Sequence, residues 1–152
     1  DFTLEMMRRG RIRPGAGPVG WVPADALALP FPDGSFDAVV SGYLMRNVGD
    51  IPRAWAEQYR VLRPGGRLVC LDTPPPPPGW RGLPVRLYLR LVLPLLGGLV
   101  AGDRAAYTYL QSSTEGFATA EELAASMRAA GFREVGFRRR MFATMAIHWG
   151  IK

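Results

Sequence analysis

Apolar positions recur at helical spacing in three parts of the chain. This repeat predicts amphipathic helices over residues 3–13, 51–62 and 120–130, each with one apolar face. The third has start and stop signals as well, because Thr119 is a favoured N-cap and Gly131 a favoured C-terminal stop. We therefore expect three helices that each pack one side against other elements.

Two other segments are apolar without that repeat. Residues 36–42 (FDAVVSG) and 67–71 (RLVCL) are short continuous runs bounded by turn residues, which is typical of strands covered on both faces. They flank the helix expected over residues 51–62, so the order strand, helix, strand indicates a parallel pair with a right-handed crossover. Further strands are predicted over residues 20–23, 134–139 and 143–148. The pattern therefore predicts an α/β fold.

The most apolar stretch covers residues 83–101 and comes soon after five consecutive prolines, residues 74–78. Arg86 and Arg90, together with two prolines, argue against a membrane-spanning helix in this stretch. The proline run is a stiff spacer rather than a domain boundary, because apolar sequence resumes directly after it. We expect a single domain.

Composition narrows the class of protein. With 152 residues, 48% of them apolar, the chain can bury one domain-sized core, which excludes a disordered tail and a disulfide-stapled miniprotein. Cys70 is the single cysteine, so we expect no internal disulfide and no metal site, and a reducing cytoplasm as the location. The net charge of +6 comes almost entirely from arginine, since Lys152 is the one lysine. This excess fits a membrane surface or an arginine-rich genome better than nucleic acid, because the basic residues are scattered.

The familiar catalytic constellations are absent from the sequence. His148 is the only histidine, and a lone histidine is more often structural than catalytic. No phosphate-binding P-loop occurs, and Gly15-Ala16-Gly17 makes only a poor GxGxxG motif, because Pro14 and Pro18 flank it and no helix is predicted to follow. Asp33 and Asp37 are spaced like a carboxylate pair, but their setting favours closing a turn over acid–base work.

A resemblance emerges from the order of several ordinary segments. These segments are Asp1 followed by a helix, Ala24-Asp25-Ala26, Leu29-Pro30-Phe31, Ser35 to Val40, and Tyr59 to Leu68 with its Arg-Pro-Gly-Gly. Together they resemble the downstream two-thirds of a class I methyltransferase that uses S-adenosyl-L-methionine. More specific pieces are Asp1-Phe2-Thr3, Arg46-Asn47-Val48, Ala101-Gly102-Asp103, Tyr107 with Tyr109, and Ala146-Ile147-His148…Gly150…Lys152. These pieces narrow the resemblance to the ubiquinone/menaquinone biosynthesis C-methyltransferase family.

The resemblance implies an incomplete Rossmann-like sheet. The family's strand order is 3-2-1-4-5-7-6, with parallel strands and an antiparallel C-terminal strand, and the first strand with its Gly-rich loop is missing here. Residues 1–152 would be the C-terminal two-thirds of one domain, with an inserted apolar helical segment at about residues 80–112. Loss of the central strand would bare two hydrogen-bonding edges. We therefore expect these residues alone to bind the cofactor poorly and to lack turnover.

The resemblance also assigns residues to the methyl donor. Asp1 is implied as the ligand of the cofactor ribose, and Asp25 with the Ala26 N–H as the ligands of the adenine. Met6 would line the adenine face, although packing in the helix core is an alternative, and a turn cap is the alternative for Asp25. Gly42, at the end of a strand, would face the donor; many family members have Ser at this point, so a side-chain contact there is in doubt. This interpretation requires Asp1 and Asp25 to converge on one nucleoside.

On the acceptor side, Arg46 and Asn47 are implied as catalytic residues. A guanidinium can stabilise the phenolate that makes a quinol ring electron-rich, but it cannot serve readily as a base. A water or a carboxylate such as Asp103 is the better candidate for the base. Tyr107 and Tyr109 could form the wall of a quinol pocket, with ordinary packing as the alternative. For Arg46 the alternative is a solvated loop charge.

The implied function is methylation of a ring carbon of a prenylated, demethylmenaquinol-like quinol. There are two rival hypotheses. The protein could be a class I methyltransferase for another small lipophilic acceptor, or an inactive remnant that acts as a binding module. The apolar stretch 83–101 would receive the prenyl tail, contact the inner face of the membrane, or cover the active site as a lid. No nucleic-acid partner is expected, and the oligomeric state is left open.

Overall fold

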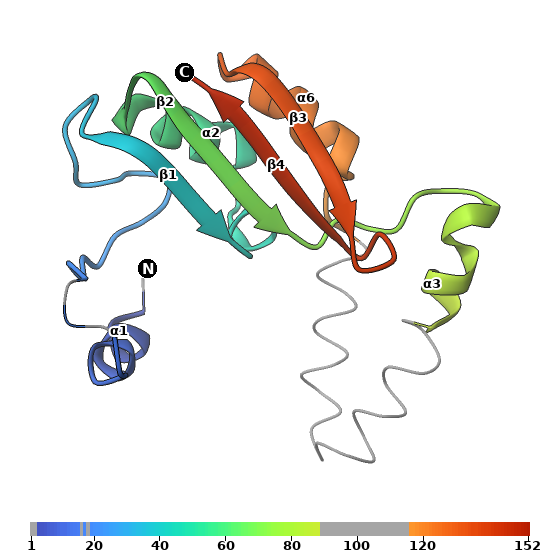
Figure 1. The fold of residues 1–152 in the computed structure, drawn as a ribbon, viewed down its shortest axis with the longest axis horizontal. Helices are drawn as coiled ribbons and strands as arrows, with labels where there is room; N and C mark the ends of the chain where they lie inside the picture. Colours follow the sequence, from blue (N-terminus) through green and yellow to red (C-terminus); the bar gives the residue numbers. More distant parts are fainter. Residues whose placement is uncertain (1–2, 16, 18, 89–115) are drawn as a thin grey trace.

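The computed structural model describes residues 3–15, 17, 19–88 and 116–152. Four strands form one mixed sheet in the order β1-β2-β4-β3 (Figure 1). Their bounds are Phe36–Gly42 for β1, Leu62–Asp72 for β2, Arg133–Arg140 for β3 and Met145–Ile151 for β4. Strands β1 and β2 are parallel, whereas β4 runs antiparallel to both of its neighbours, β2 and β3.

Helices accompany these strands and precede them. The described helices are α1 (Leu4–Arg11), α2 (Ile51–Val61), α3 (Leu83–Leu87) and α6 (Ala120–Ala129), with 3₁₀ turns η1 (Met45–Asn47) and η2 (Trp80–Gly82). None of the described helices is long and apolar enough to cross a bilayer. The segment expected at about residues 80–112 begins with η2 and α3, and its remainder lies outside the described residues.

Side chains cap the two helices that pack on the sheet. The Asp50 carboxylate accepts the Arg53 N–H at 3.0 Å at the start of α2. The Thr119 hydroxyl accepts the Glu122 N–H at 3.2 Å, and the Glu122 carboxylate accepts the Thr119 N–H at 2.8 Å, which is a complete capping box for α6. The predicted start of this helix is thereby confirmed.

One face of the sheet carries the core. Helices α2 and α6 both lie on this face, and no described helix covers the opposite one (Figure 1). Alternate side chains of β2 point into the core, because successive residues of a strand face opposite sides. The buried cluster contains Met45, Ala54, Trp55, Leu62, Leu68, Cys70, Leu123, Met127 and Phe132.

Strand β2 begins five residues earlier than the sequence predicted. Leu62 already pairs with Phe36, and the ladder resumes only at Arg67 opposite Ala38. The intervening Arg-Pro-Gly-Gly forms an irregularity inside the strand, with Gly65 at φ +78°. The residue after β4 supplies its hydrogen bonds. The Gly65 N–H donates to the Lys152 carbonyl, and the Lys152 N–H donates to the Gly66 carbonyl, each at 3.0 Å. The turn residues therefore bend a strand rather than precede it.

The strand predicted over residues 20–23 is wrong. These residues are irregular, and the nearest extended pairing is an isolated bridge between Asp25 and Ala28. A strand needs a hydrogen-bonding neighbour, and no described strand pairs with these residues. Helix α1 lies apart from the sheet (Figure 1). Strand β1 is an edge strand, in agreement with the expected order, of which the described strands reproduce the second half.

Candidate active site at the carboxyl ends of β1 and β2

The carboxyl ends of the two parallel strands lie side by side. Gly42 is in register with Leu71, and the Tyr43 N–H donates to the Leu71 carbonyl at 2.8 Å. The backbone of Tyr43 then turns into the left-handed region, at φ +56°, and η1 begins two residues later. Ligands of open α/β sheets bind at this end of the strands. The chain reversal after β1 therefore projects η1 over the expected site.

Arg46, on η1, is held against the end of β2. Its Nη1 donates to the Thr73 hydroxyl at 3.0 Å, and its Nε lies 4.0 Å from Asp72 Oδ1. Its guanidinium carbon is 5.4 Å from the centre of the Tyr43 ring, which is a cation–π distance. The side chain is only 17% exposed. Arg46 is thus a fixed cation at the strand ends, and the alternative of a solvated loop charge is wrong.

Asp72 is the partner that sequence reasoning missed. It ends β2 and is fully buried, and its carboxylate accepts the N–H groups of Thr73 at 2.8 Å and Arg46 at 3.3 Å. Burial raises the pKa of Asp72, and these two N–H groups with the Arg46 charge act in the opposite direction. A carboxylate directly after a buried strand was the signal for it, because such strands end at the ligand side of the sheet.

Asn47 and Gly42 complete this end of the sheet. The Asn47 amide Nδ2 donates to the Tyr43 carbonyl at 2.7 Å, so its side chain closes the same loop that carries Arg46. Gly42 is exposed, and a Cβ added there would meet nothing within 4 Å. The glycine leaves open space, and a serine at this position would also fit.

The predicted adenine ligands lie in a tight turn before β1. The Asp25 Oδ1 atom accepts the Leu27 N–H at 2.9 Å, and the Asp25 carbonyl accepts the Ala28 N–H at 3.1 Å. The turn cap suggested for Asp25 is therefore present. Its other carboxylate oxygen and the Ala26 N–H have no partner among the described residues. One acceptor and one donor stay available side by side, which is the pair that adenine recognition needs.

Arg60 of α2 fastens this turn region to the core. Its guanidinium donates to the carbonyls of Leu29 at 2.9 Å and Phe31 at 2.7 Å, and to the carboxylates of Asp33 at 2.8 Å and Glu57 at 2.9 Å. Glu57 in turn accepts the Leu29 N–H at 2.8 Å, and the hydrogen bond from Arg60 lowers the pKa of Glu57. Asp33 thus serves structure, in line with the turn assignment.

Met6 does not pack in a helix core. Its side chain is 63% exposed, whereas the neighbouring Met7 is the buried residue of α1. The alternative of core packing for Met6 is therefore wrong, and its expected contact with adenine stays a prediction.

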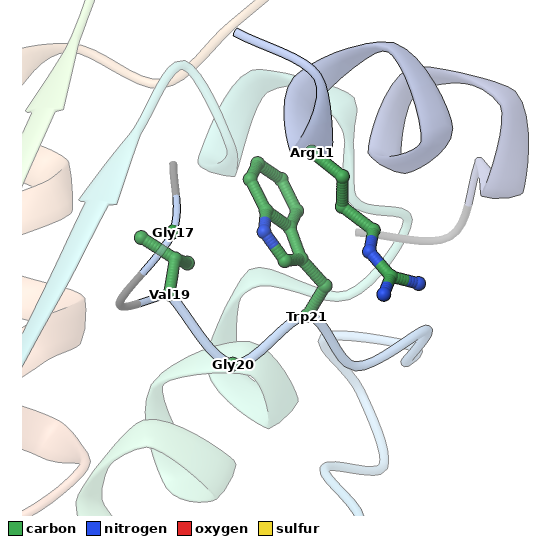
Figure 2. A pocket seen from close by; sticks show the side chains of 5 residues that line it. All are labelled: Arg11, Gly17, Val19, Gly20 and Trp21. Atoms are coloured by element: carbon green, nitrogen blue, oxygen red, sulfur yellow. The ribbon is translucent and has the colours of Figure 1, made fainter. Parts of the chain in front are cut away.

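A pocket of about 440 Å³ lies where α1 meets the loop that follows it. Its lining residues are Arg11, Gly17, Val19, Gly20 and Trp21 (Figure 2). The Trp21 ring packs so closely on Gly10 that a Cβ there would collide with it. Among the described residues, none of those predicted to bind donor or acceptor lines this pocket, and neither do Arg46 and Asp72.

Several predicted residues cannot be placed. Asp1, Asp103, Tyr107 and Tyr109 lie outside the described residues. The expected convergence of Asp1 and Asp25 on one nucleoside therefore stays a prediction. Within the described ranges, no group of three His, Cys, Asp or Glu side chains could hold a metal ion.

His148 points into the core rather than to the strand ends. It is fully buried, its Nε2 lies 2.9 Å from the Ala120 carbonyl, and its ring stacks on Phe137 with centroids 5.4 Å apart. A carbonyl only accepts, so Nε2 carries the proton. Burial lowers the pKa of His148 and keeps the ring neutral. These contacts have the character of a structural histidine.

Known sequences similar to this one match the chain over its whole length. The model of the ubiE/COQ5 methyltransferase family matches residues 1–152. The chain is 47% identical to the ubiquinone/menaquinone biosynthesis C-methyltransferase UbiE of Desulfotalea psychrophila, over 100% of this chain and 62% of that one. It is 53% identical to a demethylmenaquinone methyltransferase of Thermus thermophilus, over 99% of this chain and 69% of that one. The chain thus spans about two-thirds of the length of these relatives.

Solved structures share the fold at lower identity. A SAM-dependent methyltransferase from Aquifex aeolicus superposes with a TM-score of 0.66 at 15% identity, covering 99% of this chain and 65% of that one. A SAM-dependent methyltransferase from Thermotoga maritima gives a TM-score of 0.58 at 22% identity, covering 85% and 62%. The four-stranded sheet is therefore part of a Rossmann-like class I methyltransferase fold.

Proposed function

The chain belongs to the ubiE/COQ5 methyltransferase family, and from this premise we propose that it is the acceptor-facing part of an enzyme that methylates a ring carbon of a prenylated quinol. The names of the relatives support a quinol acceptor, and the Thermus thermophilus relative favours a demethylmenaquinol. The observation that carries the proposal is the Arg46 guanidinium, held by Thr73 and Asp72 at the carboxyl ends of β1 and β2.

The donor in this proposal is S-adenosylmethionine (SAM), which supplies an electrophilic methyl group on its sulfonium when bound. The available groups fit such a molecule. The second carboxylate oxygen of Asp25 would accept from the adenine amine and the Ala26 N–H would donate to a ring nitrogen, because neither of these two groups has a partner in the described structure. Gly42 leaves open space for close backbone approach at the strand end. Asp1 and Met6 would complete the binding of the nucleoside.

Arg46 would act on the acceptor. Methylation at carbon needs an electron-rich ring, and a fixed cation beside the ring oxygen favours the phenolate form. A guanidinium keeps its proton at any physiological pH, so Arg46 stabilises charge and does not remove the proton. Asn47 holds the loop that carries it. We assign the base to Asp103 or a water, and the pocket wall to Tyr107 and Tyr109.

The test is a chimera that joins this chain to the N-terminal third of the Thermus thermophilus relative. It should transfer a labelled methyl group from S-adenosylmethionine to demethylmenaquinol. Replacing Arg46 by Gln should lower kcat by a factor on the order of 10² to 10³ and change the KM for the donor little. The matched control is Arg63→Gln, since Arg63 is half exposed and its guanidinium pairs with the exposed Asp37 carboxylate at 2.6 Å, an arginine–carboxylate contact outside the candidate site. An R46Q chimera with unchanged kcat would refute the catalytic assignment.

A binding module without catalysis is the second candidate, because residues 20–23 form no strand and α1 lies apart from the sheet. Calorimetry with S-adenosylhomocysteine separates the two. Micromolar binding by the chimera, without binding by the 152 residues alone, supports the enzyme. A chimera that binds S-adenosylhomocysteine but methylates no quinol supports the binding module. A chimera that methylates another lipophilic acceptor in preference supports a methyltransferase with a different substrate.

A further inference from the structure

The turn between β3 and β4 holds two large apolar side chains out into solvent. Phe142 is 92% exposed and Met141 is 66% exposed. Both residues and the next one, Ala143, have positive φ values of 50 to 68°, a conformation that is uncommon for residues other than glycine. The Met141 carbonyl closes the turn by accepting the Thr144 N–H at 3.1 Å and its hydroxyl at 2.7 Å. The backbone conformation and the hydrogen bonds of the turn thus hold Met141 and Phe142 in this exposed position.

The base of this hairpin is fixed to its surroundings by Arg139. Its guanidinium donates to Glu121 of α6 at 2.7 Å and lies 5.8 Å from the centre of the Phe137 ring. It also reaches the Pro75 carbonyl at 3.5 Å. Because its base is tied to a helix and to the proline run, the tip extends from a firm support.

Two further arginines flank the apolar pair. Arg138 and Arg140 are exposed, and the alternation along β3 puts both on the sheet face opposite to Arg139. Neither has a carboxylate partner in the described part of the chain. Two arginines without a carboxylate partner among the described residues therefore stand beside two exposed apolar side chains.

This combination favours a lipid surface over a protein partner. A stable protein interface buries about 800 Å² on each side, far more than one projecting turn offers. An anionic bilayer fits the tip, because Phe and Met can enter the boundary of the acyl chains while arginines remain among the phosphates. We propose that Met141 and Phe142 insert into the surface of an anionic membrane, with Arg138 and Arg140 contacting its headgroups.

The position of the tip agrees with this. Asp72 pairs with Ala146 near the start of β4, so the turn lies at the same end of the sheet as the candidate site (Figure 1). Helix α3 lies near that end as well (Figure 1), and its Leu83 and Leu87 are each 48% exposed. Membrane contact would bring the site to the surface in which a prenylated quinol resides. That last consequence rests on the proposed function, whereas the contact itself does not.

The experiment is flotation of the 152-residue chain with vesicles of phosphatidylcholine, with and without phosphatidylglycerol. The chain should float with the anionic vesicles only. M141S/F142S should weaken the partitioning roughly tenfold, and R138Q/R140Q roughly fivefold per arginine. The controls are Val40→Ser, which removes another apolar side chain that is 78% exposed, and R11Q/R13Q, which removes exposed arginines elsewhere. Neither control should change flotation.

A dye on the tip supplies a second readout. Cys70 is buried, so a thiol-reactive, environment-sensitive dye should label F142C selectively, and its emission should shift to the blue with anionic vesicles. Circular dichroism checks that each variant keeps its helices. The proposal fails if M141S/F142S floats like the parent chain, if Val40→Ser weakens flotation equally, or if the dye does not shift. It also fails if the tip variants abolish only self-association, which would make a second copy the partner. Methyl transfer plays no part in these outcomes, so they are independent of the proposed activity.

Discussion

The described structure has two parts, here called the N-terminal half (residues 3–24) and the sheet half (from Phe36 onward), which differ in whether their elements have long-range hydrogen-bonding partners. From Phe36 onward, each strand has a paired neighbour, and α2 and α6 bury one face of the sheet. In residues 3–24, α1 is held by hydrogen bonds within the helix, and the segment expected as a strand, residues 20–23, is irregular. A helix satisfies its hydrogen bonds locally, while a strand depends on a neighbour. The difference shows that local elements survive without long-range partners and that sheet elements do not.

Residues 25–34 form the boundary between these halves. They contain no regular element, yet Arg60 and Glu57 hold them to α2 through several hydrogen bonds. This attachment keeps the predicted adenine ligands in position even though the preceding segment is unpaired. The comparison can be tested in both halves and at this boundary.

The largest expected effect separates two tryptophans. Trp55 is fully buried in α2, so Trp55→Ala should lower the free energy of unfolding by about 3–5 kcal/mol. Trp21 is 37% exposed beside α1, and Trp21→Ala should cost about 1 kcal/mol or less. Urea titrations followed by circular dichroism measure both, with Trp55→Phe as a milder variant if Trp55→Ala does not fold. Equal losses would contradict a difference between the halves.

A smaller effect is expected at the boundary. Arg60→Met removes the hydrogen bonds to the Leu29 and Phe31 carbonyls and to Glu57. Amide exchange at Leu29 should then accelerate about tenfold or more, because its acceptor Glu57 loses the cation that orients it. The control Arg63→Met removes an exposed pair with Asp37 and should leave this amide unchanged. Unchanged exchange in the R60M variant would mean that the segment is held by other contacts.

The pH dependence of thermal stability tests the burial of His148 in the sheet half. Burial lowers its pKa in the folded chain, so the unfolded chain binds a proton first as the pH falls. Its stabilising contribution is complete above the unfolded pKa of about 6.5 and declines as the pH falls through the lower folded pKa. Thermal unfolding should therefore show a falling Tm between about pH 7.5 and 5.5. The H148Q variant should lose most of this slope; an unchanged slope would place its origin elsewhere.

The smallest effect concerns the reactivity of a single thiol. Burial raises the pKa of Cys70 to about 11, so its thiolate is scarce at neutral pH and access requires the sheet to open. A thiol reagent should modify it only slowly in the folded chain. Under the same conditions, trypsin should cut after Arg11, in the N-terminal half, well before Cys70 reacts. The reverse order would indicate that the sheet opens more readily than the N-terminal half.

The sequence predicted the elements that depend on local signals. Helices α2 and α6 begin and end within a residue of expectation, because the apolar periodicity is clear in both and Thr119 marks the start of α6. Strand β1 matches the apolar run over residues 36–42. The early start of β2 was hidden, since Pro64 and two glycines are turn residues by composition and form a strand irregularity only when β1 and β4 flank them.

The candidate site was foreseen in part. Arg46 and Asn47 were found through the resemblance, yet spacing along the chain contains no sign that Arg46 would meet Asp72 and Thr73, some 26 residues later. That contact exists because parallel pairing aligns the ends of β1 and β2.

Local periodicity and capping therefore determined which segments of this chain become helices and which are apolar enough for a sheet. Only the tertiary structure decided which strands form and which charges meet. The reason is physical: a helix closes its hydrogen bonds within four residues, whereas a strand or a buried ion pair requires partners that folding brings from far along the chain.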